Sequence, residues 1–446
     1  MSAEIIELTD KIDVDPFWMP FTANRDFKRK PRIITGAKGH HYTGADGEQI
    51  YDFFSGLWTV GVGHCHPKIV EAVQHQVAHL DHGMSFQVGS DRSFQLAKKL
   101  TDVAPEGFTR AFFTNSGSES VDTALKIALG YHRVQGNGQR TRLIGRERGY
   151  HGVNFGGMSV GGIVANRQMF SANLIPGVDH MRTTCDLAHT AFSRGQPEWG
   201  AHLADDLLRI ATLHGPDTIA AVIVEPAGGS TGILPPPVGY LERLREICTA
   251  HGILLIFDEV ITGFGRTGAS FGAERFGVMP DIITTAKGLT NGVIPMGAVL
   301  VREEIYDAFM RGPDAAVELF HGYTYSGHPV AAAAGLATLE VLEEEAIFDQ
   351  AAALSQPFEQ MLHSFADLDN VIDVRNIGLM GAIELAPRPG APGARGLEVH
   401  KRCFVEERIA VRNGLDVIQF SPFLNSKVDD WERAFERIHH VITTIA

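Results

Sequence analysis

Cysteine is scarce in this sequence, with four residues among 446 and no Cys-x-x-Cys pair. Such spacing argues against a disulfide framework and for reduced thiols at Cys65, Cys185, Cys248 and Cys403. Long apolar runs are also missing, and no stretch approaches the ~18 residues that a membrane-spanning helix needs. Positive charge is in deficit, since 39 Lys and Arg face 53 Asp and Glu and the formal net charge is -14. This balance disfavours binding to nucleic acid or to an anionic membrane.

The start of the chain lacks the basic residues of a secretory signal, because residues 1–15 alternate acidic and aliphatic types. We therefore expect a soluble, cytoplasmic protein. The one basic cluster, residues 25–32, is short and is expected to form a solvated loop. No internal repeat or low-complexity segment is found. At ~150 residues per domain, the length predicts two or three domains.

The middle of the chain alternates strand-like and helix-like stretches, which predicts an α/β fold with a mainly parallel central sheet. Short apolar strands are expected at residues 111–114, 219–224, 253–257 and 281–286. Amphipathic helices are expected at residues 118–134 and 239–251. The second helix is followed by Gly252, which suits the position just after a helix end.

The C-terminal part has a different pattern. A long helix rich in alanine and leucine is expected over residues 329–345. It is followed by two strands and a surface loop, at residues 371–375, 381–385 and 387–395. We therefore predict a large domain at residues 60–329 and a smaller α+β domain at residues 330–446. Residues 1–59 form an N-terminal segment that joins the smaller domain.

Three chemical groups fall at the ends of predicted strands, where open α/β sheets bind their ligands. Ser116, Gly117 and Ser118 lie between a strand and a helix, where free backbone N–H groups can bind a phosphate. An ordinary helix cap explains the same residues. Asp258 emerges from an apolar strand and needs a cation or strong donor as its partner, although a structural loop-capping role is common.

Lys287 follows another strand, between Ala286 and Gly288. Small neighbours leave room for a bulky group, and a desolvated lysine becomes a nucleophile toward an aldehyde. Taken singly, a surface lysine is the simpler interpretation. Together, a phosphate anchor, a strand-end Asp and a strand-end Lys are what pyridoxal phosphate (PLP) requires. Tyr150 adds an aromatic ring that can lie on the cofactor.

These motifs resemble the class III aminotransferases of PLP fold type I. The resemblance rests on motifs in family order across nearly the whole chain, at residues 115–119, 149–152, 224–226, 257–266, 286–288 and 323–329. Within the class, four further segments are most similar to the ω-amino acid:pyruvate branch, whose type donor is β-alanine. These segments are residues 18–24, 55–58, 235–237 and 411–412.

The resemblance implies a role for each matching residue. Lys287 holds the cofactor as a Schiff base, and Asp258 pairs with its ring nitrogen. The remaining cofactor-binding positions are Ser116, Gly117, Ser118, Tyr150, His151, Glu225, Val260 and, from a second subunit, Thr324. The substrate-binding positions are Phe21, Trp58, Phe86 from across a homodimer, Tyr150, Arg412 and Gln419.

The implied reaction is a ping-pong transfer of an amino group to pyruvate, which gives alanine. Arg412 binds the substrate carboxylate, a task suited to guanidinium. Relatives that use 2-oxoglutarate carry an acidic residue shortly after the Glu-Pro pair, whereas this chain has Ser230 there. The donor stays open between β-alanine, taurine, a polyamine and an arylalkyl amine. A tetramer is the alternative assembly.

Three other interpretations are weaker. Residues 263–268 match GxGxxG and favour an NAD-dependent dehydrogenase, but residues 269–278 contain two glycines and make a poor crossover helix. His64-Cys-His66 has no second ligand cluster at a suitable spacing, so we expect loop histidines rather than a metal site. Racemases, decarboxylases and aminomutases of the same fold share the Lys and the Asp; Trp58 and Arg412 favour transfer.

Overall fold

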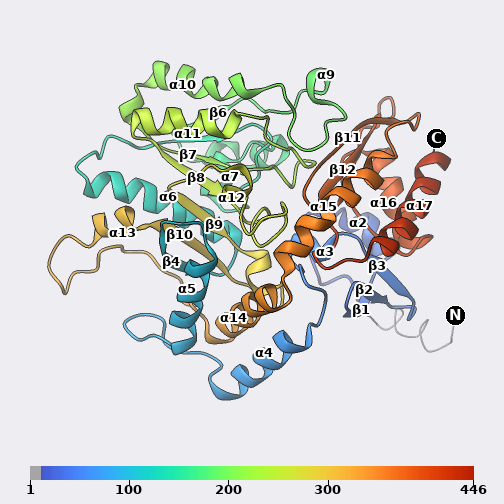
Figure 1. The fold of residues 1–446 in the computed structure, drawn as a ribbon, viewed down its shortest axis with the longest axis horizontal. Helices are drawn as coiled ribbons and strands as arrows, with labels where there is room; N and C mark the ends of the chain where they lie inside the picture. The colour runs from blue at the N-terminus through green and yellow to red at the C-terminus, as the bar shows by residue number, and fades with distance from the viewer. Residues whose placement is uncertain (1–11, 446) are drawn as a thin grey trace.

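The largest sheet of the computed structural model has seven strands in the order β4-β10-β9-β8-β7-β5-β6 (Figure 1). Its strands are β4 (Phe108–Thr114), β5 (Arg142–Arg146), β6 (Val178–Met181), β7 (Ile219–Val224), β8 (Leu254–Asp258), β9 (Ile282–Thr285) and β10 (Gly297–Arg302). Only β10 runs antiparallel to its neighbours. The predicted α/β fold with a mainly parallel sheet is therefore confirmed. The structure describes residues 12–445, so most of the expectation about the first fifteen residues falls outside it.

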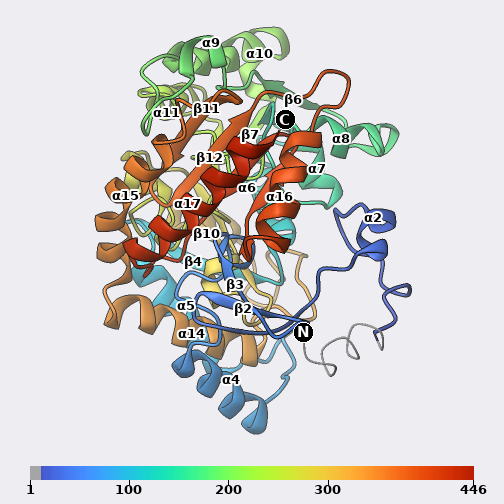
Figure 2. The same cartoon turned by 90° about the vertical axis from the view of Figure 1, so that its right-hand side faces the viewer.

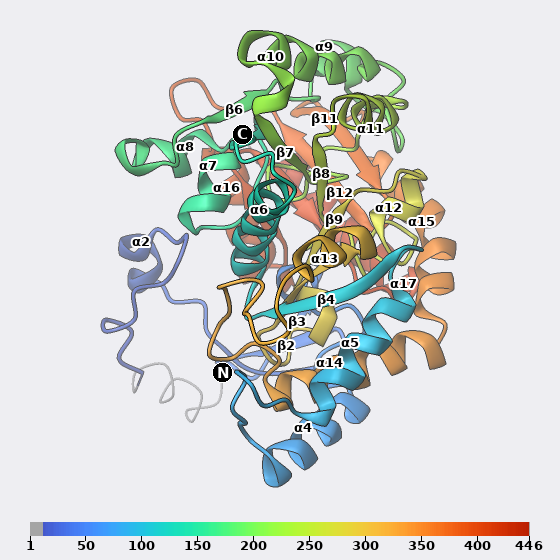
Figure 3. The same ribbon diagram turned by 90° about the vertical axis from the view of Figure 1, so that its left-hand side faces the viewer.

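The central strands are buried along their whole length because both faces of the sheet are covered. Every residue of β7, β8 and β9 is buried. Alternate side chains enter separate cores, so Val222 packs in one cluster and Ile223 in the other. Helix α6 (Gly117–Val134) covers one face (Figure 3), and α11 (Tyr240–His251) covers the other.

A second, antiparallel sheet has the order β11-β12-β15-β14. Its strands are β11 (Val371–Ile377), β12 (Met380–Leu385), β14 (Arg412–Gly414) and β15 (Val417–Phe420). Figure 1 shows the C-terminal helices gathered beside it, namely α15 (Ile347–His363), α16 (Ala394–Val405) and α17 (Val428–Thr444). Helix α14 (Pro329–Glu344) leads from the large sheet to this region, as the alanine-rich pattern predicts.

The third sheet joins the two ends of the chain. It contains β1 (Ile34–Lys38), β2 (His41–Gly44), β3 (Gln49–Asp52) and β13 (Ile409–Ala410). The parallel pairing of β3 with β13 places the N-terminal segment against the C-terminal region, and both are visible in Figure 2. The joining of residues 1–59 to the smaller domain stays a prediction. The domain boundaries at residues 59/60 and 329/330 stay predictions.

The other elements are short or lie at the periphery. They are helices α2 (Asn24–Arg29), α3 (Ser55–Trp58), α4 (Pro67–His79), α5 (Asp91–Val103), α7 (Phe155–Val160), α8 (Val164–Gln168), α9 (Leu187–Thr190), α10 (Asp206–His214), α12 (Gly272–Phe276) and α13 (Glu303–Phe309). The 3-10 turns are η1 (Ser171–Asn173), η2 (Ala201–Asp205), η3 (Pro216–Thr218) and η4 (Lys287–Thr290). Within residues 12–445, no helix is long and apolar enough to cross a membrane.

Some sequence-based predictions need correction. The basic cluster at residues 25–32 is not only a loop, because α2 includes most of it. The loop predicted to end at Arg395 ends earlier, since α16 begins at Ala394 behind Gly393 in a left-handed conformation. The dehydrogenase interpretation lacks its crossover helix, because α12 has only five residues. All four cysteines are unpaired, as expected.

Candidate active site

The carboxyl ends of β4, β9, β8 and β7 meet at one edge of the large sheet. Although β4 is separated from β9 by the antiparallel β10, Thr114 and Thr285 pair with the adjacent residues Gly297 and Ala298. A cavity of about 600 Å³ opens at this edge. Its walls include Phe21, Trp58, Gly117, Ser118, Tyr150, His151, Glu225, Asp258, Val260, Lys287 and Arg412. The structure thus brings together most of the residues that the sequence predicted.

The N-terminus of α6 forms one end of the cavity. The Ser116 hydroxyl caps the helix by accepting a hydrogen bond from the Glu119 N–H at 3.2 Å. The Glu119 carboxylate in turn accepts from the Asn115 N–H at 2.7 Å. Gly117 and Ser118 follow in the first turn, where N–H groups have no intrahelical acceptor, and both line the cavity. An anion is therefore favoured there.

Close packing around this helix end requires glycine at two positions. A Cβ on Gly117 would lie 2.9 Å from Val260 Cγ1, and one on Gly152 would lie 2.4 Å from the Ser118 hydroxyl oxygen. Gly152 also has φ +90°, which disfavours any side chain. PLP is a flat ring that carries a phosphate group. The helix end suits the phosphate, and the apolar Val260 side chain suits the ring.

Asp258 ends β8 with its carboxylate buried. One oxygen, Oδ2, accepts from His151 Nδ1 at 2.8 Å, and Oδ1 accepts from the Thr284 hydroxyl at 3.1 Å. His151 Nε2 is buried and has no hydrogen-bond partner among the described residues. A carboxylate fixed in this way can accept a hydrogen bond from a protonated pyridine nitrogen.

Lys287 follows β9 and begins η4 with φ +44°, a left-handed conformation that few residues other than glycine adopt. Its Nζ lies 5.2 Å from the centre of the Trp58 ring. Burial lowers the pKa of Lys287 to about 8, although the charges of Asp258 and Glu225 oppose this change. More of the amine is therefore unprotonated at neutral pH, as a nucleophile toward an aldehyde requires.

Glu225 follows β7 and fixes the turn that carries Tyr150 and His151. Its carboxylate accepts from the Tyr150 N–H at 3.0 Å and from the Gly229 N–H at 2.9 Å. Burial raises the pKa of Glu225 and also that of Tyr150. The phenol of Tyr150 consequently stays neutral where it faces the cavity.

The opposite end of the cavity carries a positive charge. Arg412 Cζ lies 4.9 Å from the centre of the Trp58 ring, and its Nη1 donates to Gln419 Oε1 at 3.4 Å. Gln419 also donates to the Ser230 carbonyl at 3.5 Å. No carboxylate pairs with Arg412 among residues 12–445, so its guanidinium is available to a ligand. Phe21, 78% exposed, stands at the rim.

Four predicted residues do not line this cavity. Ser116 and Gln419 adjoin it, through the cap of α6 and the hydrogen bond to Arg412, whereas Phe86 and Thr324 lie apart from it. Phe86 is 55% exposed, and Thr324 is exposed with its carbonyl accepting a hydrogen bond from the Ser85 hydroxyl at 2.8 Å. A Cβ on Gly322 would be 3.1 Å from Phe86, so the two predicted residues belong to neighbouring parts of one surface. A single chain does not bring them to its own cavity.

Several lining residues were not predicted. They are Pro20, Leu57, Ile163, Asn166, Ile261 and Asn413. Most of them are chain neighbours of predicted residues, and that adjacency was the only signal available. Ile163 and Asn166 belong to a segment without a motif and reach the cavity through folding alone.

The loop histidines behave as expected, since His64 bonds to the Asp52 carboxylate at 2.9 Å and His66 to that of Glu345 at 3.1 Å.

Comparison with known proteins defines the family. The sequence profile described as aminotransferase class-III matches residues 22–442. An omega-aminotransferase of Caulobacter vibrioides is 57% identical over 430 residues, or 96% of this chain and 98% of that protein. A beta-alanine–pyruvate aminotransferase of Pseudomonas aeruginosa is 49% identical over 442 residues, or 98% of each chain.

A solved structure agrees with the sequence comparison. It is an amine transaminase from an uncultivated Pseudomonas species in its PLP-bound form, with TM-score 0.88 and 34% identity over 96% of this chain and 99% of that one. The chain therefore belongs to the class III aminotransferases, which use PLP. The predicted family, fold type and cofactor are confirmed, whereas the role of each site residue stays a prediction.

Proposed function

We propose that this aminotransferase moves the amino group of an ω-amino acid of the β-alanine type, or of a related primary amine, to pyruvate. One observation carries the proposal. The guanidinium of Arg412, which pairs with no carboxylate among the described residues, lines the same cavity as the Lys287 amine. Arg412 Cζ and Lys287 Nζ lie 4.9 and 5.2 Å from the centre of the Trp58 ring. A carboxylate at one end and a reacting amino or keto group at the other suit both substrates. The names of the two sequence relatives support the same pair.

The acceptor preference rests on the polarity beside Arg412. The neighbouring group is the Ser230 backbone carbonyl, held through Gln419, and no acidic side chain masks the guanidinium among the described residues. An unmasked guanidinium binds a carboxylate in either half of the reaction, so a monocarboxylate such as pyruvate is favoured. Taurine, polyamines and arylalkyl amines are the alternative donors.

The catalytic steps assign work to individual side chains. PLP supplies an aldehyde for the incoming amine and a ring that takes up negative charge. The Asp258 carboxylate would pair with the ring nitrogen. Lys287 Nζ would hold the cofactor covalently and, when free, would take up the proton that leaves the substrate carbon. Arg412 orients the substrate by its carboxylate.

The other residues at the cofactor site bind the cofactor and take no part in proton transfer. The N-terminus of α6 binds the phosphate, and an aromatic and an aliphatic side chain enclose the ring. The residues with these roles are Ser116, Gly117, Ser118, Tyr150, His151, Glu225 and Val260. His151 and Glu225 act behind the ring, since the first bonds to Asp258 and the second fixes the Tyr150 turn.

We also propose a homodimer in which each subunit completes the other's site. Support comes from exposed apolar side chains that line a second hollow of about 630 Å³, namely Met84, Val88 and Phe94, and from the exposed Phe86 in the same segment of chain. Monomers rarely expose such a patch. Thr324 lies in the same region, so a partner can present it to the phosphate. A tetramer is the alternative assembly.

Subunit mixing tests the dimer. Lys287→Ala and Thr324→Ala homodimers are each expected to have little activity. A mixed dimer has one site with both defects and one site with neither, so each mixed dimer should have half of the wild-type activity. In an equal mixture about half of the dimers are mixed, so the mixture should recover about a quarter of the wild-type value. No restoration after verified subunit exchange would contradict the shared site.

The visible spectrum tests the reaction. Adding β-alanine without a keto acid should bleach the absorbance of the lysine-bound cofactor, and pyruvate should restore it where 2-oxoglutarate does not. A band that persists with β-alanine but bleaches with an aryl amine, a polyamine or taurine would move the donor to that class. Restoration by 2-oxoglutarate alone would refute the acceptor assignment.

A further inference from the structure

The turn that carries Trp58 has an unusual backbone. Ser55 has φ 44° and Trp58 has φ 57°, with Gly56 at φ 70° between them. A non-glycine residue in a sparsely populated region is strained, and such a conformation persists only where its surroundings impose it. The structure must therefore contain groups that hold this turn.

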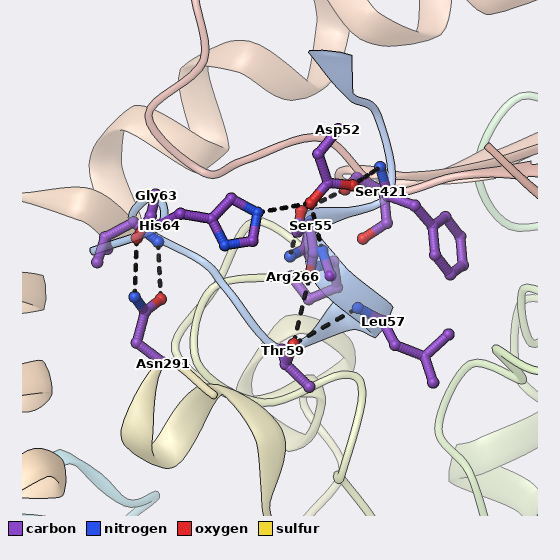
Figure 4. Close-up of polar contacts among 12 residues, drawn as sticks. Asp52, Ser55, Leu57, Thr59, Gly63, His64, Arg266, Asn291 and Ser421 are labelled. Carbon is purple, nitrogen blue, oxygen red and sulfur yellow. Dashed lines mark hydrogen bonds and ion pairs between the residues drawn. The ribbon is translucent and has the colours of Figure 1, made fainter. Parts of the chain in front are cut away.

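Asp52 is the principal anchor (Figure 4). It is 1% exposed, and its Oδ1 accepts from the Phe54 N–H at 3.0 Å while Oδ2 accepts from the Gly56 N–H at 2.6 Å. His64 Nε2 also bonds to Oδ2, at 2.9 Å. One carboxylate thus binds two backbone groups of the turn and connects it to the following loop.

The same turn is held from its other side. The Ser55 hydroxyl donates to the Ser421 carbonyl and accepts from Arg266 Nη2 at 3.4 Å. Arg266 is buried, its Nη1 donates to the Pro422 carbonyl at 2.5 Å, and no carboxylate bonds to it among the described residues. Burial lowers the pKa of Arg266 to about 9, and the charge of Asp52 opposes this change. Asp52 therefore also compensates a buried cation.

The loop after the turn is tied to the segment that carries the catalytic lysine. Asn291, directly after η4, accepts from the Val62 N–H at 3.1 Å and donates to the Gly63 carbonyl at 3.0 Å. Figure 4 shows Asn291 beside Gly63 and His64. The Trp58 turn is consequently fixed relative to η4, which begins at Lys287.

We propose that Asp52 is a positioning residue for substrate selection, which acts by holding the indole of Trp58 against Arg412. The ring lies 4.9 Å from the Arg412 guanidinium and 3% of it is exposed. If the turn relaxes, the indole no longer packs against the guanidinium. Arg412 then adopts side-chain conformers that cannot bind the substrate carboxylate. This inference rests on the proposed role of Arg412 in binding the substrate carboxylate.

The test compares half-reactions of the holoenzyme and its Asp52→Asn variant. An amide keeps the volume but cannot accept from both the Phe54 and Gly56 N–H groups. We expect the apparent Kd for pyruvate and β-alanine to rise about tenfold, since one hydrogen bond to a charged group is at stake. The maximal rates, the cofactor content and the apparent Kd for 1-phenylethylamine, which has no carboxylate, should change less than about twofold.

Asp373→Asn is the matched control. Asp373 is also 1% exposed and binds a backbone N–H, that of Phe192 at 2.5 Å, but it lies in β11 and lines no part of the cavity. This variant should lower thermal stability without changing the ratio between carboxylate and uncharged substrates. A second variant, Ser55→Ala, removes the opposite anchor more mildly and should shift the same ratio in the same direction by about threefold.

The outcomes separate this inference from the proposed function. Wild-type enzyme that does not use pyruvate refutes the proposed acceptor, and the ratio is then measured with whichever keto acid it does use. The positioning role is overturned if Asp52→Asn leaves the ratio between carboxylate and uncharged substrates unchanged, as the control should. An equal loss of affinity for all substrates has the same meaning. If Asp52→Asn does not fold, the Ser55→Ala ratio decides alone.

Discussion

The amine of Lys287 provides the sharpest prediction, because its chemistry depends on its pKa. Burial lowers this pKa from an ordinary 10.5 to about 8. A decrease of that size raises the unprotonated fraction at neutral pH by about 300-fold. The apo-protein should therefore contain one lysine far more reactive than its exposed lysines.

Nearby charges set the direction in which this pKa moves. Asp258 and Glu225 raise the pKa of Lys287, whereas Arg412 lowers it. Asp258→Asn should consequently lower the pKa below its wild-type value. Arg412→Ala should raise it. Opposite shifts from two substitutions in one cavity distinguish electrostatics from a general loss of structure.

Competitive labelling of the apo-protein measures these values. Trace acetic anhydride is added across a pH series, and peptide mass spectrometry gives the rate at each lysine. Lys68 is the internal control, because its pairing with Glu340 and Glu344 raises its pKa. A Lys287 midpoint near the ordinary value, or a higher midpoint in Asp258→Asn, would refute the reasoning.

Three further predictions concern other parts of the site. Arg412→Ala should slow the pyruvate half-reaction about 100-fold and spare an uncharged amine, because the lost contact is a charge-assisted pair; equal losses in stopped-flow traces would count against it. Gly117→Ala should weaken PLP retention in equilibrium dialysis about tenfold, since the new methyl meets Val260 at 2.9 Å, and adding Val260→Ala should recover part of the loss. Burial raises the pKa of Glu259 to about 7, so the folded state binds the extra proton and stability falls as pH rises from about 4.5 to about 7, by at most ~3 kcal/mol. Glu259→Gln should flatten that part of the thermal-unfolding profile, and an unchanged slope would falsify the assignment.

The strand-end residues were predictable because a parallel sheet has simple geometry. Asp258 and Lys287 each follow an apolar run, and parallel strands place their carboxyl ends at one edge. The glycines beside the helix cap were equally visible in the sequence. The same reasoning failed at Arg395, which the turn-rich composition around it placed in a loop although it lies in a helix.

The interface residues were predicted by resemblance alone. Phe86 and Thr324 lie on an exposed surface, and neither contacts the cavity of its own chain. No local pattern shows that a residue acts in another molecule. Their assignment depends on an assembly, and that assembly stays a prediction.

The sequence by itself determined the family, the parallel sheet, the cofactor class and the residues at the strand ends, because these depend on local patterns and motifs. Tertiary structure decided how Trp58 meets Arg412 across more than three hundred residues of chain. It also decided that Asp52 is an anchor, since its backbone partners are local but the strain that they oppose exists only in the folded turn. Long-range contacts and conformational strain have no periodic signal in a sequence, because they arise only when distant segments pack together.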